Sequence, residues 1–136
     1  MMKKLILTLT LALGTIWAFG QPKSFQLSSH ILDISKGAPA SGVSIKLEKM
    51  DQAKSTWMLL DQKVTDQNGR ISEFLSSENP NIGIYKLTYL IADYFKKQEI
   101  DSFYPFIEVV FEIKDNKHYH VPITLSAYGY STYRGN

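Results

Sequence analysis

The sequence contains no cysteine. This excludes disulfide frameworks, thiolate zinc sites, iron–sulfur clusters and cysteine nucleophiles. Phosphate-loop, dinucleotide-binding and His-Glu-x-x-His motifs are also missing. There is no excess of one charge either, because without Lys3 and Lys4 the 15 basic residues become 13, equal to the 13 acidic ones. The chain therefore gives no electrostatic reason to expect a nucleic-acid partner.

Long hydrophobic runs are scarce as well. The apolar run from Leu5 to Trp17 is about 13 residues, shorter than the roughly 20 that a spanning helix needs. Lysines precede it, and Ala18-Phe19-Gly20 places small residues three and one positions before Gln21. This pattern predicts a cleaved secretory signal peptide over residues 1–20 rather than a permanent membrane anchor. We expect a periplasmic or secreted domain over residues 21–136, without membrane attachment.

The rest of the chain predicts an all-β sandwich. Apolar and polar residues alternate over Val43–Lys49, Ile107–Ile113 and His118–Leu125, the period of a half-buried strand. Further strand candidates are rich in aromatic and β-branched residues: Phe25–Ile34, Trp57–Val64, Ile84–Leu90 and Tyr128–Tyr133. Turn residues separate these segments, and one short helix is predicted over Ile91–Gln98. Seven or eight short strands in one domain are typical of a two-sheet sandwich.

Histidines are the main candidates for chemistry. His118 and His120 lie two residues apart in a predicted strand, so both side chains emerge on one face. Their neighbours Tyr119 and Val121 are apolar, which predicts that the histidines face solvent or a partner subunit. Two solvated polar residues would explain this pattern, and so would a zinc site with His30 as a third ligand.

The C-terminus is unusually aromatic. Three tyrosines and Arg134 occur within the last nine residues, Tyr128–Asn136. Chain ends are usually polar and frayed, so this composition predicts an edge strand or an interface.

Arg70, which follows a turn at Thr65–Gly69 and begins a strand, would alone be interpreted as a surface charge.

Five segments, taken in order, resemble the transthyretin-like family over essentially all of residues 21–136. The segments are Leu27–Asp33 with Gly37–Ala40, Thr65–Arg70, Phe103–Phe106, His118–Pro122 and Tyr133–Gly135. The last of these resembles the ending of the family's enzyme branch, the 5-hydroxyisourate hydrolases, rather than of its hormone carriers.

The resemblance implies an eight-stranded sandwich that forms a homotetramer, with active sites in the channel between dimers. It implies hydrolysis of the small molecule 5-hydroxyisourate to 2-oxo-4-hydroxy-4-carboxy-5-ureidoimidazoline, a step of urate breakdown, without metal or organic cofactor. The catalytic residues would be His30, Arg70 and His120, and the pocket would be lined by Tyr133, Arg134, Gly135 and Asn136.

These residue types suit a ring-opening hydrolysis. A histidine that titrates near neutral pH can activate water or protonate a leaving nitrogen. Arg70 remains charged and offers planar donors to an oxygen-rich anion. We expect His120 to be the base, His30 to orient the reactants or shuttle a proton, and His118 to be structural.

The sequence departs from the family pattern in its last residue. Asn136 stands where the family has serine, and Ala127 stands where it often has proline. Asn136 would slow the reaction if the serine hydroxyl relays a proton, but would substitute for it if the residue only positions substrate.

Two other function classes compete with the enzyme. One is a non-enzymatic tetrameric carrier of a small aromatic ligand, since a fold does not settle function. The other is a secreted adhesion or interaction module. Neither accounts for His30, Arg70 and His120 together, because a carrier needs no base.

Overall fold

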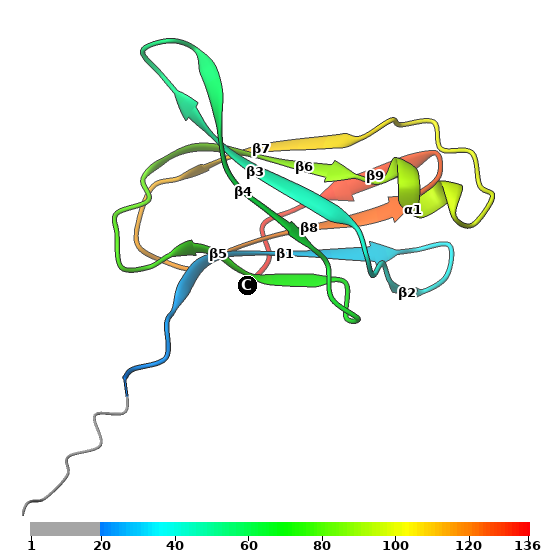
Figure 1. The fold of residues 1–136 in the computed structure, drawn as a ribbon, viewed down its shortest axis with the longest axis horizontal. Helices are drawn as coiled ribbons and strands as arrows, with labels where there is room; N and C mark the ends of the chain where they lie inside the picture. Colours follow the sequence, from blue (N-terminus) through cyan, green and yellow to red (C-terminus); the bar gives the residue numbers. More distant parts are fainter. Residues whose placement is uncertain (1–19) are drawn as a thin grey trace, which may run out of the picture.

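The computed structural model describes residues 20–136, so the predicted signal peptide lies outside the described residues except for Gly20. Within this part, nine strands and one helix follow one another (Figure 1). They are β1 (Phe25–Asp33), β2 (Ala38–Pro39), β3 (Ser44–Asp51), β4 (Thr56–Val64), β5 (Arg70–Ser76), β6 (Gly83–Leu90), α1 (Ala92–Lys96), β7 (Ile107–Ile113), β8 (Tyr119–Ser126) and β9 (Gly129–Thr132).

The strands form two sheets, which confirms the predicted all-β sandwich. In the first sheet, β1 pairs with β2 and β5 on one side and with β8 on the other, and β8 pairs with β9. The second sheet has the order β4-β3-β6-β7. All pairs are antiparallel except β1 with β8. This parallel pair brings segments some 90 positions apart into contact, for example Ser28 beside His120.

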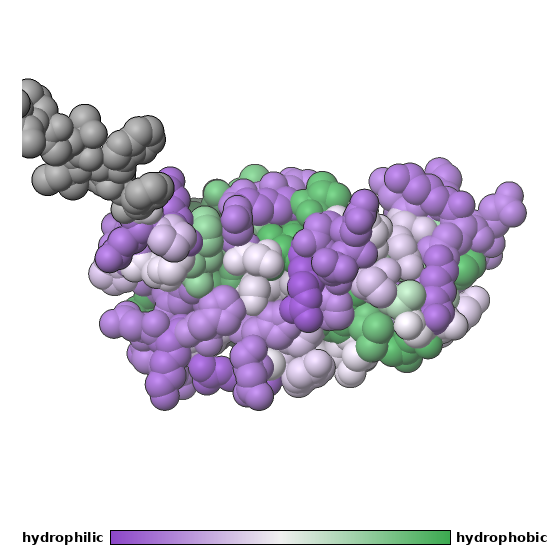
Figure 2. Space-filling model, turned by 90° about the horizontal axis from the view of Figure 1, so that it is seen from below, coloured by the Kyte–Doolittle hydropathy of each residue, from purple (hydrophilic) through white to green (hydrophobic). Residues whose placement is uncertain are grey.

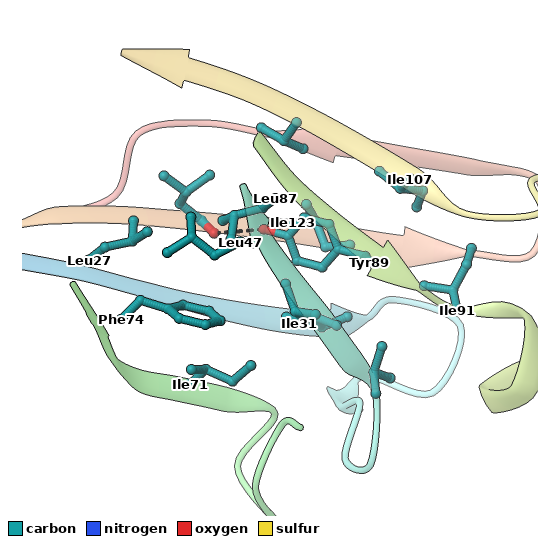
Figure 3. Packing of buried hydrophobic residues seen from close by; sticks show 14 of the residues in the cluster. Leu27, Ile31, Leu47, Ile71, Phe74, Leu87, Tyr89, Ile91, Ile107 and Ile123 are labelled. Carbon is teal, nitrogen blue, oxygen red and sulfur yellow. Dashed lines mark hydrogen bonds between the residues drawn. The ribbon is translucent and has the colours of Figure 1, made fainter. Parts of the chain in front are cut away.

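The core lies between the sheets and follows the predicted alternation (Figure 3). Ile45 and Leu47 of β3 are fully buried, as are Ile113 of β7 and Leu125 of β8. Burial of one such side chain contributes about 1.5–3 kcal/mol. The buried Tyr89 also needs a polar partner, and its hydroxyl donates to the backbone oxygen of Val121, as the dashed line in Figure 3 indicates.

The structure differs from the predictions at three short segments. The helix covers Ala92–Lys96, shorter than the predicted Ile91–Gln98, and only Phe95 of it is buried. The segment Lys36–Pro39, whose residue types predict a turn, contains the two-residue strand β2. The C-terminal segment forms the predicted edge strand, β9, but this strand covers Gly129–Thr132 rather than Tyr128–Tyr133, and Tyr130 is 41% exposed. In residues 20–136, helices of the length and hydropathy required to cross a bilayer are not found.

Candidate functional site

Three of the predicted site residues lie on adjacent strands of the first sheet. His30 is on β1, Arg70 begins β5 and His120 is on β8. Because the residues on either side of His30 are buried in the core, its side chain points away from the core, and the same holds for His120. Their strands lie in the lower part of Figure 1, and Figure 2, a view from below, shows a mostly hydrophilic surface. His118 is exposed and His120 is half-buried, whereas Tyr119 between them is buried, which confirms the prediction that the two histidines face outward.

Strand register brings these side chains into one row. His30 is directly opposite Arg70 across β1 and β5, which places their Cβ atoms about 5 Å apart. On the other side of β1, His30 is level with Pro122, two residues after His120. The row therefore contains two imidazoles and one guanidinium on one outward face.

A tight turn positions Arg70. Asp66 accepts backbone N–H groups from Asn68 and Arg70 on one carboxylate oxygen, at 2.8 and 3.0 Å. Gly69 has φ = 68°, a conformation that favours glycine. The backbone oxygen of Gly69 accepts the N–H of Ile31 at 2.9 Å, which ties the turn to β1 beside His30.

Gly69→Ala is expected to lower the free energy of unfolding by about 2 kcal/mol. A Cβ at this position would lie 2.7 Å from the backbone oxygen of Ile31 and 2.9 Å from Cβ of Pro39. Gly37→Ala is the matched control, because Gly37 has a similar φ of 62° with nothing within 4 Å of a Cβ. Urea denaturation of both variants measures the difference. An equal loss of unfolding free energy in the two variants would show that the contact of Gly69 with β1 is unimportant.

Burial and the charge of Arg70 lower the pKa of both histidines, which favours the neutral ring. Partial burial lowers the pKa of His30, and Arg70 lowers it further, against the backbone of Asn68 and the charge of Asp66. The pKa of His120 is also lowered, first by burial and then by Arg70, His30 and His118. A neutral imidazole has a free nitrogen that can accept a proton.

Ser28 joins the histidines and was not predicted as a site residue. Its Oγ lies 2.8 Å from Nε2 of His118 and 2.8 Å from Nδ1 of His120. The signal available in the sequence is weak: Ser28 is two residues before His30, and thus on the same face of β1. Its approach to β8 depends on the parallel pairing of β1 and β8, which sequence patterns do not specify.

The C-terminal segment divides between two places. Gly135 forms a bridge with His120, whose backbone oxygen accepts its N–H at 2.8 Å. The Arg134 guanidinium lies 4.3 Å from the ring centroid of Tyr119, a buried residue of the inner face. Tyr133 and Arg134 line a pocket with Tyr119 and residues of β7. Asn136 is exposed. Of the predicted pocket residues, the structure thus brings Gly135 against His120, and places Arg134 over a ring of the opposite face.

The zinc alternative lacks a ligand cluster. Within residues 20–136, no three His, Asp or Glu side chains are arranged to hold a metal ion. Between His118 and His120 lies the Ser28 hydroxyl, hydrogen-bonded to both rings.

This chain is similar to known proteins over most of its length. A probable 5-hydroxyisourate hydrolase of Caenorhabditis elegans is 43% identical over 97% of this chain and 96% of the relative. The structure of Klebsiella pneumoniae 5-hydroxyisourate hydrolase matches with a TM-score of 0.70 and 36% identity, over 81% of this chain and 98% of that one. A sea bream transthyretin in complex with thyroxine matches with a TM-score of 0.75 and 28% identity, over 81% and 94% of the two chains.

A family model also matches most of the chain. The model describes the HIUase/Transthyretin family and covers residues 27–135. This range contains all nine strands apart from the first two residues of β1, and includes His30, Arg70 and His120. The chain belongs to the HIUase/Transthyretin family.

Proposed function

We propose that this protein hydrolyses 5-hydroxyisourate to 2-oxo-4-hydroxy-4-carboxy-5-ureidoimidazoline. The observation that carries the proposal is the outward row of His30, Arg70 and His120 on adjacent strands. Relatives named 5-hydroxyisourate hydrolase support it, since they match over most of the chain at about 40% identity. Hydrolysis of a cyclic amide needs a base, an acid and a group that stabilises an oxyanion, and this row contains candidates for all three.

In the proposed mechanism, neutral His120 takes a proton from water while the water oxygen attacks a ring carbonyl. Negative charge develops on the carbonyl oxygen, where the Arg70 guanidinium donates hydrogen bonds. The carbon–nitrogen bond then breaks, and His30 shuttles the proton to the leaving nitrogen. The water oxygen thus ends on the carbonyl carbon, one of its protons goes to the leaving nitrogen, and the other stays on the new carboxylic acid, which releases it to solvent.

A coupled assay tests the proposal. Urate oxidase generates 5-hydroxyisourate in the cuvette, and its ultraviolet absorbance is followed with and without the protein. We expect faster decay when the protein is present. Decay at the spontaneous rate, from a correctly folded protein, would contradict the proposed activity.

The rate should fall in acid, with a midpoint below 6.5. Burial and Arg70 lower the pKa of His120 from its ordinary value of 6.5, so the base stays neutral until the pH falls below that value. Arg70→Met removes the nearby charge, which should raise the pKa of His120 and move the midpoint to higher pH. Arg70→Lys keeps the charge and is the matched control. A midpoint that stays in place in Arg70→Met would show that Arg70 does not act on His120.

A carrier function is the second candidate, supported by the fold likeness to the thyroxine-bound sea bream transthyretin. A carrier would bind a small aromatic ligand without accelerating decay of 5-hydroxyisourate. Calorimetric titration with aromatic ligands, beside the coupled assay, distinguishes the two functions.

We also propose that the active protein is a homotetramer, with sites in the channel between dimers. In the single chain, Arg70 is exposed to solvent, and electrostatic stabilisation of an oxyanion is strongest where water is excluded. Exposed aromatic residues at the C-terminal edge, Tyr130 and Tyr133, are available for such contacts. Analytical ultracentrifugation tests this. From the predicted signal peptide we also propose that the protein acts in the periplasm or outside the cell, which cell fractionation tests.

A further inference from the structure

We propose that Ser28 and His118 are positioning residues that set the tautomer of His120, so that Nε2 of His120 is the free base. This inference rests on the proposed function and deepens it. Its basis is a continuous chain of three hydrogen bonds between β1 and the segment His118–His120, from the backbone oxygen of Phe25 to the ring of His120.

Donors and acceptors in this series of hydrogen bonds can be assigned because its first acceptor is a carbonyl oxygen. Nδ1 of His118 lies 3.0 Å from the backbone oxygen of Phe25. A carbonyl oxygen only accepts, so Nδ1 of His118 carries the proton. In the neutral ring, Nε2 of His118 is then left with a lone pair. This nitrogen is the acceptor that faces Ser28 at 2.8 Å.

The same assignment extends through the Ser28 hydroxyl to His120. Because Nε2 of His118 accepts, the single hydroxyl proton of Ser28 is donated to it. Ser28 Oγ can then only accept from Nδ1 of His120, 2.8 Å away. Nδ1 of His120 therefore carries the proton of the neutral ring, and Nε2 keeps the lone pair that accepts a proton from water.

An orienting partner of this kind has large effects on histidine catalysis. Where a carboxylate holds the tautomer of a catalytic histidine, its replacement by an amide costs about 10⁴ in rate. A neutral hydroxyl binds less strongly than a carboxylate. We therefore expect Ser28→Ala to lower kcat by about 10- to 100-fold, with a smaller change in KM.

The tautomer can be read without substrate. The chain has three histidines, so ¹⁵N-histidine NMR of the full protein at pH 8 gives signals from three rings. Variants that each replace one histidine assign these signals. We expect His120 to be protonated on Nδ1 in the wild type and to shift towards the Nε2-protonated form in Ser28→Ala. Ser28→Thr keeps the hydroxyl and should restore the wild-type tautomer. Wild-type His120 protonated on Nε2, or an unchanged tautomer in Ser28→Ala, would overturn the inference.

Kinetics in the coupled assay supply the second readout. His118→Phe should lower kcat about as much as Ser28→Ala, and the double variant should be no slower than either, because both residues act through one chain. Additive losses would contradict this. Ser131→Ala is the matched control, since its hydroxyl lies on β9, 2.6 Å from that of Thr124, and should leave tautomer and rate unchanged. If NMR finds His120 protonated on Nδ1 but the protein does not accelerate decay of 5-hydroxyisourate, the hydrogen-bond chain is supported and the proposed function is rejected.

Discussion

His120→Asn is expected to reduce kcat by about 10³-fold, which corresponds to about 4 kcal/mol of transition-state stabilisation. The substitution keeps a short N–H donor that can reach the Ser28 hydroxyl, now 2.8 Å from Nδ1 of His120. It removes Nε2, the nitrogen proposed to accept the proton of water. The ring lies on the outward face of β8 and is only partly buried, so the free energy of unfolding should change by less than about 1 kcal/mol.

The pH profile distinguishes loss of the base from general damage to the site. Residual activity of His120→Asn should no longer fall in acid with the midpoint of the wild type, because the titrating group is gone. Thr124→Val is the matched control: it lies four residues further along the same face of β8 and bonds Ser131 rather than a histidine. Near-wild-type turnover in folded His120→Asn would remove this residue from the mechanism.

Gly135→Ala is expected to lower kcat by about 100-fold without a comparable loss of stability. A Cβ at Gly135 would lie 2.5 Å from Cδ2 of His120 and 3.2 Å from its Cγ, so the imidazole must move. Displacement of a catalytic group by about 1 Å can cost about 10²-fold in rate. The same movement breaks the contact of the ring with Ser28.

Gly129→Ala provides the comparison for this effect. It lies at the start of β9, and its Cβ would meet only Ser126 Oγ, at an ordinary 3.7 Å. We expect Gly129→Ala to retain wild-type turnover. A crystal structure of Gly135→Ala should show the His120 ring turned away from Ser28. A ring in its original place, with turnover unchanged, would contradict the steric account.

Fold class could be predicted because the relevant signal is local. Side chains alternate with a period of two along β3, β7 and β8, and the inward set of each strand is the set that the structure buries. Hydrophobic burial selects the face, so the outward direction of His118 and His120 followed from their apolar neighbours. The helix was predicted too long because Ile91 is its N-cap and because, after Lys96, Gln98 and Glu99 donate to oxygens three residues back and Glu99 has φ = 57°, which ends the α-helix.

The site was predicted only in part, and through resemblance. His30, Arg70 and His120 are far apart in the sequence, and the pattern around Arg70 alone indicated a surface charge. Ser28 was missed because its two partners, His118 and His120, lie some 90 positions away in the sequence. Arg134 was predicted to line the substrate pocket with its neighbours, and its guanidinium lies 4.3 Å from the ring centroid of Tyr119.

The sequence by itself determined which residues are inward, where the chain turns and which chemical groups are available, since these depend on side-chain type and near neighbours. Tertiary structure alone decided which groups meet. Parallel pairing of β1 with β8 sets Ser28 beside His120, and antiparallel pairing of β1 with β5 sets Arg70 opposite His30. A register shift of one residue in either pair would turn one of these side chains to the other face of the sheet. The site therefore depends on strand register, which is set by the packing of the whole core.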